Sequence, residues 1–299
     1  MPTIHNTPYP SASTNHSPLT PQIFPPTEHA AYLTHGADQI YYVQHHHKPP
    51  FRALCLLLNP FPSERPHAYI PWVRWARHLA AQGFEVLRFD YRGTGESTGL
   101  FHHMTFSLWL EDILLFTRFL RAQNLPRPLI LHGLGLGALL ASHAFAQNAA
   151  DILSLWSPPK TGTDVLSEAL RRRVMIDYVT LPPDQRQTTQ HYIQQIENGQ
   201  TLEVEGYRWS PQMWHDAKNF PLLLPSPSPQ GGAPTPFFQI QYLDRHAEPL
   251  VAGLGQWRAL NPRAQASAFP LNPPLTDLFT TNTLWLSQTT QLWTQKKSP

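Results

Sequence analysis

The sequence has few charged residues and a net charge near zero. Charged side chains make up 14% of the 299 residues, and the formal net charge is +2. A nucleic-acid-binding protein needs a clustered basic surface, which this composition does not provide. The short run Arg171-Arg172-Arg173 is interpreted as a solvated helix face. We therefore expect no nucleic-acid partner.

Cysteine and long apolar runs are also scarce. Cys55 is the single cysteine, so an intramolecular disulfide is excluded. It lies in the apolar run 53–58 and is expected to be buried rather than reactive. No apolar run approaches the roughly 20 residues of a membrane helix, and no basic segment followed by an apolar one opens the chain. The expectation is a cytoplasmic protein without a membrane span.

The chain instead alternates between strand and helix patterns. Residues 1–28 are rich in proline, serine and threonine and are interpreted as an irregular leader. Residues 29–157 and 237–299 carry the alternation, which predicts an α/β core with a mostly parallel sheet and helices on both faces. Residues 158–236 interrupt it and are interpreted as an inserted cap with a proline-rich return.

The expected elements follow from hydrophobic periodicity. Within the cap, Ser210 followed by Pro211 suits a helix N-cap and first turn. Strands are predicted at 30–36, 39–45, 52–59, 84–90, 128–132, 151–157, 237–244 and 266–271. Helices are predicted at 71–82, 106–123, 136–147, 184–198, 249–260 and 281–293.

A glycine-rich turn, "LILHGLGLGALLA", joins the strand at 128–132 to the next helix. Its spacing matches the G-x-S-x-G nucleophile elbow of hydrolases, except that Gly135 stands where the serine would be. The same residues, from Gly133 to Ala138, also match the dinucleotide-binding fingerprint G-x-G-x-x-A. That interpretation requires an acid at the end of the following strand, whereas Asp151 begins it. An ordinary β-α turn is the third alternative.

The other members of a hydrolase triad are only partly present. Asp244, at the end of a late predicted strand, is the candidate acid. The last of the 16 histidines is His246, so no histidine follows the last predicted strand. A serine hydrolase relay would therefore lack both its nucleophile and its base.

The anion-binding part of such a site can survive these losses. The Leu136 N–H lies at the start of a predicted helix, where the backbone carries partial positive charge and can bind an anion. A second N–H is expected from the loop after Asn59, and Phe61 is the first residue there that has one. Asn59, Asp90 and His132 end predicted strands, where open α/β sheets bind ligands. These residues, with Gly135 and Asp244, form the candidate site.

Two histidine clusters raise the question of a metal. His45-His46-His47 lie on a predicted strand, where neighbouring side chains point to opposite faces and so rarely converge on one ion. His102-His103 follow the strand 84–90 and are placed near the rim of the pocket. We expect no metal site and no cofactor.

Several stretches resemble the α/β-hydrolase superfamily, and more narrowly the second hydrolase-like family associated with bacterial exosortase systems. The stretches are "NPFPSERP", "GFEVLRFDYRGTGESTG", "LWLEDI", "HGLGLGALLA", "LWSPPKTG" and "LEVEGYRWSP". The resemblance implies an α/β-hydrolase fold, a vacant elbow shared by the family, and a Gram-negative bacterium that makes exopolysaccharide and sorts surface proteins.

Two function classes remain at this point. The first is a protein with a degenerate triad that binds a small acyl or anionic ligand, or a protein partner of an exosortase or exopolysaccharide system. The alternative is an ester or thioester hydrolase with an unconventional nucleophile, for which Ser63, Ser97 and Ser157 are the candidates.

Overall fold

The computed structural model describes residues 27–46, 51–123, 126–224, 237–242, 264–268 and 275–297. Most of the expected leader, residues 1–26, the predicted helix at 249–260, Asp244 and His246 lie outside these ranges. No helix among the described residues has the length and apolar character needed to cross a bilayer.

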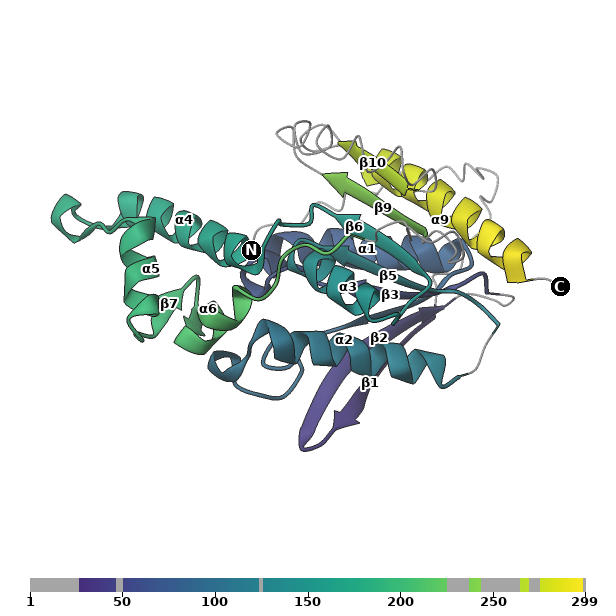
Figure 1. Ribbon diagram of the computed structural model, residues 1–299, viewed down its shortest axis with the longest axis horizontal. Helices are drawn as coiled ribbons and strands as arrows, with labels where there is room; N and C mark the ends of the chain where they lie inside the picture. The colour runs from purple at the N-terminus through teal and green to yellow at the C-terminus, as the bar shows by residue number, and fades with distance from the viewer. Residues whose placement is uncertain are drawn as a thin grey trace, which may run out of the picture.

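An eight-stranded sheet forms the centre of the molecule, with strand order β1-β2-β4-β3-β5-β6-β9-β10 (Figure 1). The β1-β2 and β2-β4 pairs are antiparallel, and the other pairs are parallel. The strands are β1 (Thr27–His35), β2 (Asp38–His46), β3 (Leu54–Leu58), β4 (Glu85–Phe89), β5 (Leu129–Leu134), β6 (Ile152–Trp156), β9 (Phe237–Tyr242) and β10 (Ala264–Ala268). The mostly parallel sheet predicted from the sequence is confirmed.

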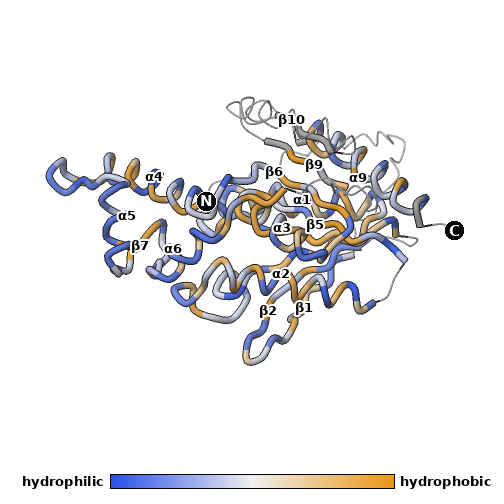
Figure 2. Tube along the Cα trace, in the orientation of Figure 1, coloured by the Kyte–Doolittle hydropathy of each residue, from blue (hydrophilic) through white to orange (hydrophobic). Residues whose placement is uncertain are grey.

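Helices cover both faces of this sheet (Figure 1). On one face α2 (Phe106–Arg121) and α3 (Leu136–Ala146) bury apolar side chains against the strands. On the other face α1 (Arg65–Ala81) and α9 (Leu275–Lys297) do the same. Figure 2 shows the hydrophobic colour concentrated along the central strands, as expected for strands buried on both faces. Cys55 lies among them and is 1% exposed.

Helix α1 starts earlier than the sequence predicts. The pattern placed its first residue at Pro71, but the helix begins at Arg65 and Pro71 lies inside it. Pro66 occupies the first turn, where the missing N–H of a proline costs nothing. The ion pair between Arg65 and Asp90, at 2.9 Å, ties this first turn to the end of β4. Tertiary contacts of the first turn therefore outweigh the preference of Pro71 for the first position of a helix. Gly83, with φ of 88°, follows the end of the helix as expected.

The segment between β6 and β9 extends to one side of the sheet (Figure 1). It contains α4 (Gly162–Thr180), the short η3 (Pro183–Gln185), α5 (Thr189–Glu197), β7 (Leu202–Val204), β8 (Tyr207–Trp209) and α6 (Pro211–Ala217). The Ser210 side chain caps α6 by accepting from the Met213 N–H, and Pro211 follows it, as predicted. Trp209 and Trp214 of this segment join the same apolar cluster as the core residues on the α2 and α3 face.

The arginine run departs from its predicted role. It lies on α4, and Arg171 is exposed as expected. Arg172 contacts Glu64 and Glu205, and Arg173 pairs with Asp177 at 2.8 Å. The interpretation as a solvated face is therefore wrong for two of the three arginines, because α4 packs its inner side against the β7-β8 hairpin and the core.

Candidate functional site

The turn between β5 and α3 has the backbone of a sharp elbow. Gly135 has φ of 56° and ψ of −120°, a conformation that strains any residue with a side chain. Its N–H donates to the Trp156 carbonyl at 2.9 Å, and its own carbonyl accepts from the N–H groups of Ala138 and Leu139. The strand, the turn and the helix are thus held together by backbone hydrogen bonds on both sides of the apex.

The two flanking glycines allow β5 and α3 to approach closely. A Cβ added to Gly133 would lie 2.3 Å from the carbonyl oxygen of Gly137. A Cβ added to Gly137 would lie 2.3 Å from the Leu58 carbonyl oxygen of β3. Neither position has room for a side chain, so the first and third glycines serve packing while the second serves backbone conformation.

The apex of the elbow faces a carboxylate. A Cβ on Gly135 would lie 3.3 Å from Oε2 of Glu64 and 3.5 Å from Cβ of Pro60. Glu64 belongs to the 3-10 turn η1 (Pro62–Glu64), which connects β3 to α1. The place towards which a nucleophile would project is therefore next to the side chain of Glu64.

Contacts from the core and from the segment after β6 hold Glu64 there. Nη1 of Arg172 lies 3.4 Å from Oε1 of Glu64, and the backbone of Phe61 favours the charged form of the carboxylate. Burial raises the pKa of Glu64 above its usual value, and the nearby carboxylates of Glu205 and Glu168 act in the same direction. Arg172 and the backbone of Phe61 oppose that shift. The Glu64 carboxylate is thus held in place by its neighbours, and because it is half-buried it is poorly hydrated.

Arg172 connects this carboxylate to the β7-β8 hairpin. Its Nε and Nη2 donate to the two carboxylate oxygens of Glu205 at 2.9 and 3.0 Å. Its Nη2 also donates to Oγ of Ser63 at 3.2 Å. A bidentate guanidinium–carboxylate pair of this kind fixes orientation as well as charge. Arg172 therefore joins the turn before α1 to the segment beside the elbow.

Phe61 and Leu136 carry the two N–H groups that the sequence predicts to bind an anion. The Leu136 N–H is the first of α3 after the apex. The Phe61 ring is fully buried, with ring centroids 5.6 Å from Trp209 and 6.0 Å from Trp109, so it anchors the loop between the core and the β7-β8 hairpin.

Asn59 and Asp90 are occupied by structural hydrogen bonds. The Asn59 Nδ2 donates to the Phe89 carbonyl at 2.5 Å. Asp90 is 3% exposed and accepts from the Glu96 N–H at 3.1 Å, in addition to its ion pair with Arg65. These side chains shape the loops at the carboxyl edge of the sheet, and the structure gives each of them a partner within the protein.

The prediction that His132 ends its strand is wrong. β5 continues to Leu134, because Gly133 and Leu134 pair with Leu155 and Trp156 of β6. The His132 ring is fully buried on the α1 side, where its centroid lies 4.6 Å from that of Trp156 and 5.3 Å from that of Trp72. Its Nδ1 pairs with the Ser154 carbonyl at 3.1 Å, and burial lowers its pKa to about 4. His132 therefore belongs to the core.

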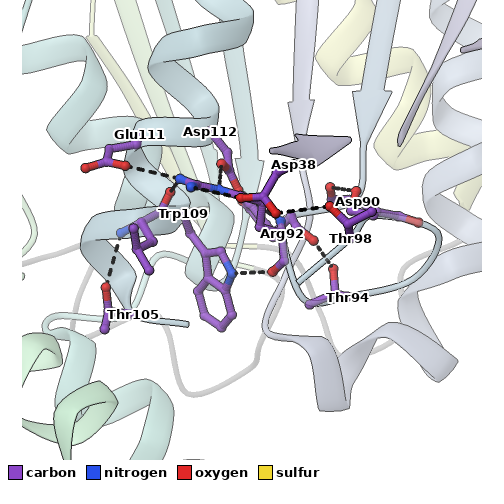
Figure 3. Close-up of polar contacts among 12 residues, drawn as sticks. Asp38, Asp90, Arg92, Thr94, Thr98, Thr105, Trp109, Glu111 and Asp112 are labelled. Atoms are coloured by element: carbon purple, nitrogen blue, oxygen red, sulfur yellow. Dashed lines mark hydrogen bonds and ion pairs between the residues drawn. The ribbon is translucent and has the colours of Figure 1, made fainter. Parts of the chain in front are cut away.

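A network around Arg92 supports the glycine-rich loop that follows β4 (Figure 3). Nε of Arg92 donates to Asp112 of α2 at 2.5 Å, and the Arg92 backbone N–H donates to the same carboxylate at 2.9 Å. Nη2 donates to Glu111 at 3.1 Å, and the Trp109 indole N–H donates to the Arg92 carbonyl at 3.0 Å. Burial raises the pKa of Asp112 to about 6, although Arg92 favours the charged form. The network fixes loop and helix to each other.

The dinucleotide alternative loses support from the structure. Asp151, which a dinucleotide site would need at the carboxyl end of β6, lies at the amino end; it accepts from the Leu129 N–H and pairs with Arg121. Within the described parts of the chain, no group of three metal-ligating side chains converges. His45 is buried, with Nδ1 3.3 Å from the Glu28 carboxylate.

The candidate serines have structural contacts as well. Ser97 Oγ donates to the Asp90 carbonyl at 2.5 Å and accepts from the Tyr41 N–H. Ser63 accepts from Arg172, and Ser157 has a positive φ of 45°.

Sequence reasoning missed Glu64, Arg172 and Glu205. Glu64 lies within the quoted stretch "NPFPSERP", two residues after Pro62. No local pattern indicates that it reaches an elbow formed by a different strand.

Comparisons with known proteins agree with this geometry. The model of the family described as serine aminopeptidase, S33, matches residues 72–160. No curated protein matches the sequence. Est1E from Butyrivibrio proteoclasticus, with ferulic acid bound, is similar in structure at a TM-score of 0.60 and 17% identity; the match covers 87% of this chain and 98% of that one.

Two further solved structures extend the likeness. The α/β hydrolase GrgF from Penicillium sp. sh18 matches with a TM-score of 0.60 and 12% identity, over 88% of this chain and 98% of that one. The mouse alpha/beta hydrolase domain-containing protein 10 matches with a TM-score of 0.55 and 18% identity, over 87% and 99%. The chain has the α/β-hydrolase fold, and its elbow lies in the family-model match.

Proposed function

We propose that this chain is a non-hydrolytic α/β-hydrolase-fold protein that binds a small acyl-bearing ligand or a protein partner at the elbow. The observation that supports this most directly is Glu64 beside the Gly135 apex. A serine hydrolase needs a hydroxyl at the apex and a free oxyanion hole. Here the apex carries no side chain, and the carboxylate of Glu64, which would repel an oxyanion, lies beside it.

The same carboxylate narrows the expected ligand. An anionic group entering between Leu136 and Phe61 would meet Glu64 and would have to displace it, which like-charge repulsion opposes. A neutral ligand that has both a carbonyl and an N–H or O–H group can instead accept the Leu136 N–H at its carbonyl oxygen and donate to Glu64. We therefore favour a neutral ligand or a peptide over the anionic ligand that the sequence alone also allowed.

The narrower kinship, to the hydrolase-like proteins of exosortase systems, is also a proposal. Its support is the set of sequence stretches given above. Among them, "HGLGLGALLA" contains the elbow, and "LEVEGYRWSP" contains the β7-β8 hairpin. It implies a partner from an exosortase or exopolysaccharide system. Affinity capture with the wild-type chain and with Gly135→Trp, which blocks the elbow, tests it: a specific partner lost in the variant supports the proposal, and equal capture contradicts an elbow-mediated contact.

A second candidate function rests on the raised pKa of Glu64. In this alternative the Glu64 carboxylate takes a proton from water, the hydroxide adds to an ester carbonyl whose oxygen accepts the Leu136 N–H, and the proton leaves with the alcohol. The reaction needs no covalent intermediate. Arg172, whose Nη1 lies 3.4 Å from Glu64, favours the charged carboxylate and weakens it as a base, which is why binding without turnover is favoured.

One experiment separates the two functions. Purified protein is incubated with a panel of activated esters and with a fluorophosphonate probe, and Glu64→Gln is the matched variant. The proposal predicts no turnover above heat-denatured protein and no labelling. Turnover that resists fluorophosphonate but is lost in Glu64→Gln would establish the water-activating alternative. Turnover abolished by fluorophosphonate would contradict both and would indicate a serine away from the elbow.

A further inference from the structure

A cavity of about 660 Å³ opens at the amino ends of β3 and β5, at the edge of the sheet opposite the elbow. Its walls are the segments that lead into these two strands and one side of α9. This volume falls in the range of small-molecule sites, roughly 300–1,000 Å³. The elbow function described above assigns no role to this cavity.

Two arginine side chains line the cavity. Arg52 and Arg127 each lie two residues before Leu54 and Leu129, which are paired in adjacent parallel strands. Arg127 Nη2 pairs with Glu85 at 2.9 Å, while its Nη1 is buried without a hydrogen-bond partner in the part of the chain that the structure describes. No described residue that lines the cavity is acidic.

Hydroxyl and amide groups of α9 face the same space. Arg52 Nη1 donates to Oγ of Ser287 at 3.2 Å. Thr290 also lines the cavity; it is 4% exposed, and its Oγ1 has no partner among the described residues. Gln288 adds an amide. A buried hydroxyl and a buried guanidinium nitrogen without partners are costly unless a ligand satisfies them.

We propose that this cavity binds the phosphate group of a small organic phosphate. Arginine recognises phosphate through parallel N–H···O bonds. Arg127 shares its charge with Glu85 but keeps Nη1 without a partner among the described residues, and Arg52 adds a second guanidinium to the same cavity. A carboxylate has two acceptor oxygens, whereas a phosphate group has three terminal ones. The cavity offers more donors than two oxygens can accept from, because it is lined by two arginines, Ser287, Thr290 and Gln288. The organic part of the molecule lies against Phe51, whose ring Arg127 also covers at 5.2 Å.

Inorganic phosphate is the probe for the first test, by calorimetric titration at constant ionic strength. Arg52→Gln removes one exposed guanidinium and is expected to weaken phosphate binding by about tenfold or more, the loss of one charge-assisted bond. Arg74→Gln is the matched control, because it makes the same change on the exposed side of α1. Arg127 is left intact because its removal would leave the buried Glu85 without its partner.

Thr290→Val provides a second, independent variant. Valine keeps the shape and removes the unpartnered hydroxyl, so the melting temperature without phosphate should stay the same or rise while phosphate binding weakens. A fall in melting temperature would show that the hydroxyl already has a partner, and would remove one support of the proposal.

The remaining outcomes are also decisive. No binding of phosphate by the wild type, or binding that neither Arg52→Gln nor Thr290→Val reduces, overturns the proposal. Acetate that binds as tightly as phosphate, with the same dependence on both variants, overturns the phosphate assignment in favour of a carboxylate. Phosphate binding does not depend on ester turnover, so this test and the elbow test can fail separately.

Discussion

Gly135→Ser tests the interpretation of the elbow directly. The serine must adopt φ of 56° and ψ of −120°, which costs about 1–3 kcal/mol for a residue with a side chain. Its Cβ would lie 3.3 Å from the Glu64 carboxylate and 3.5 Å from Pro60, so the side chain fits after small shifts of Glu64. For a chain of this size we expect the melting temperature to fall by about 2–12 °C while the protein remains folded.

The same variant should remain a poor esterase. Its hydroxyl regains a place beside the Leu136 N–H, but the described side chains nearest to it are those of Glu64 and Pro60, and neither carries an imidazole. His132 is buried on the other side of β5 with its Nδ1 bound to Ser154, and its lowered pKa makes it a weak base. Glu64 is close enough to accept a hydrogen bond, yet a carboxylate is a much weaker base than histidine for this purpose.

Turnover of activated esters is the assay, with Gly135→Ala as the control that bears the same backbone strain without the hydroxyl. The reasoning is refuted if folded Gly135→Ser turns over at the rate of a typical enzyme, on the order of 10 per second. A functional base would then already be in place, outside the described residues or by rearrangement of Glu64. Equal melting temperatures for the wild type and both variants would refute the strain argument.

Two further variants test how the site is supported. Gly137→Ala places a Cβ 2.3 Å from the Leu58 carbonyl oxygen. We expect this overpacking to lower the free energy of unfolding, measured with urea, by about 1–3 kcal/mol or more. An unchanged urea midpoint would contradict the close approach of α3 to β3. Asp112→Asn removes the fully buried carboxylate that pairs with Arg92. We expect the free energy of unfolding, measured in the same way, to fall by about 3–5 kcal/mol. Arg92 also lies 3.1 Å from Glu111 and 3.6 Å from Asp38. A loss of unfolding free energy below about 1 kcal/mol would show that these two carboxylates are sufficient partners for the guanidinium.

Local patterns in the sequence determined the α/β alternation and the elbow. The buried strand run at 52–59 and the amphipathic helix at 106–123 depend on periodicity within a few residues, which the sequence displays directly. The glycines of "HGLGLG" likewise indicate the elbow directly from the sequence. Only glycine is unstrained at the φ of Gly135, and only glycine fits in the space at Gly133 and Gly137.

The tertiary structure alone decided what occupies the two ends of the sheet. Glu64 reaches Gly135, and Arg172 reaches Glu64, only because β3 and β5 are neighbours and α4 returns over their carboxyl ends. His132 is a core residue because β5 extends past it. Arg52 and Arg127 line one cavity because the same two strands are neighbours. Contacts between residues far apart in the chain follow from strand order and helix packing, and no periodicity within one segment encodes them.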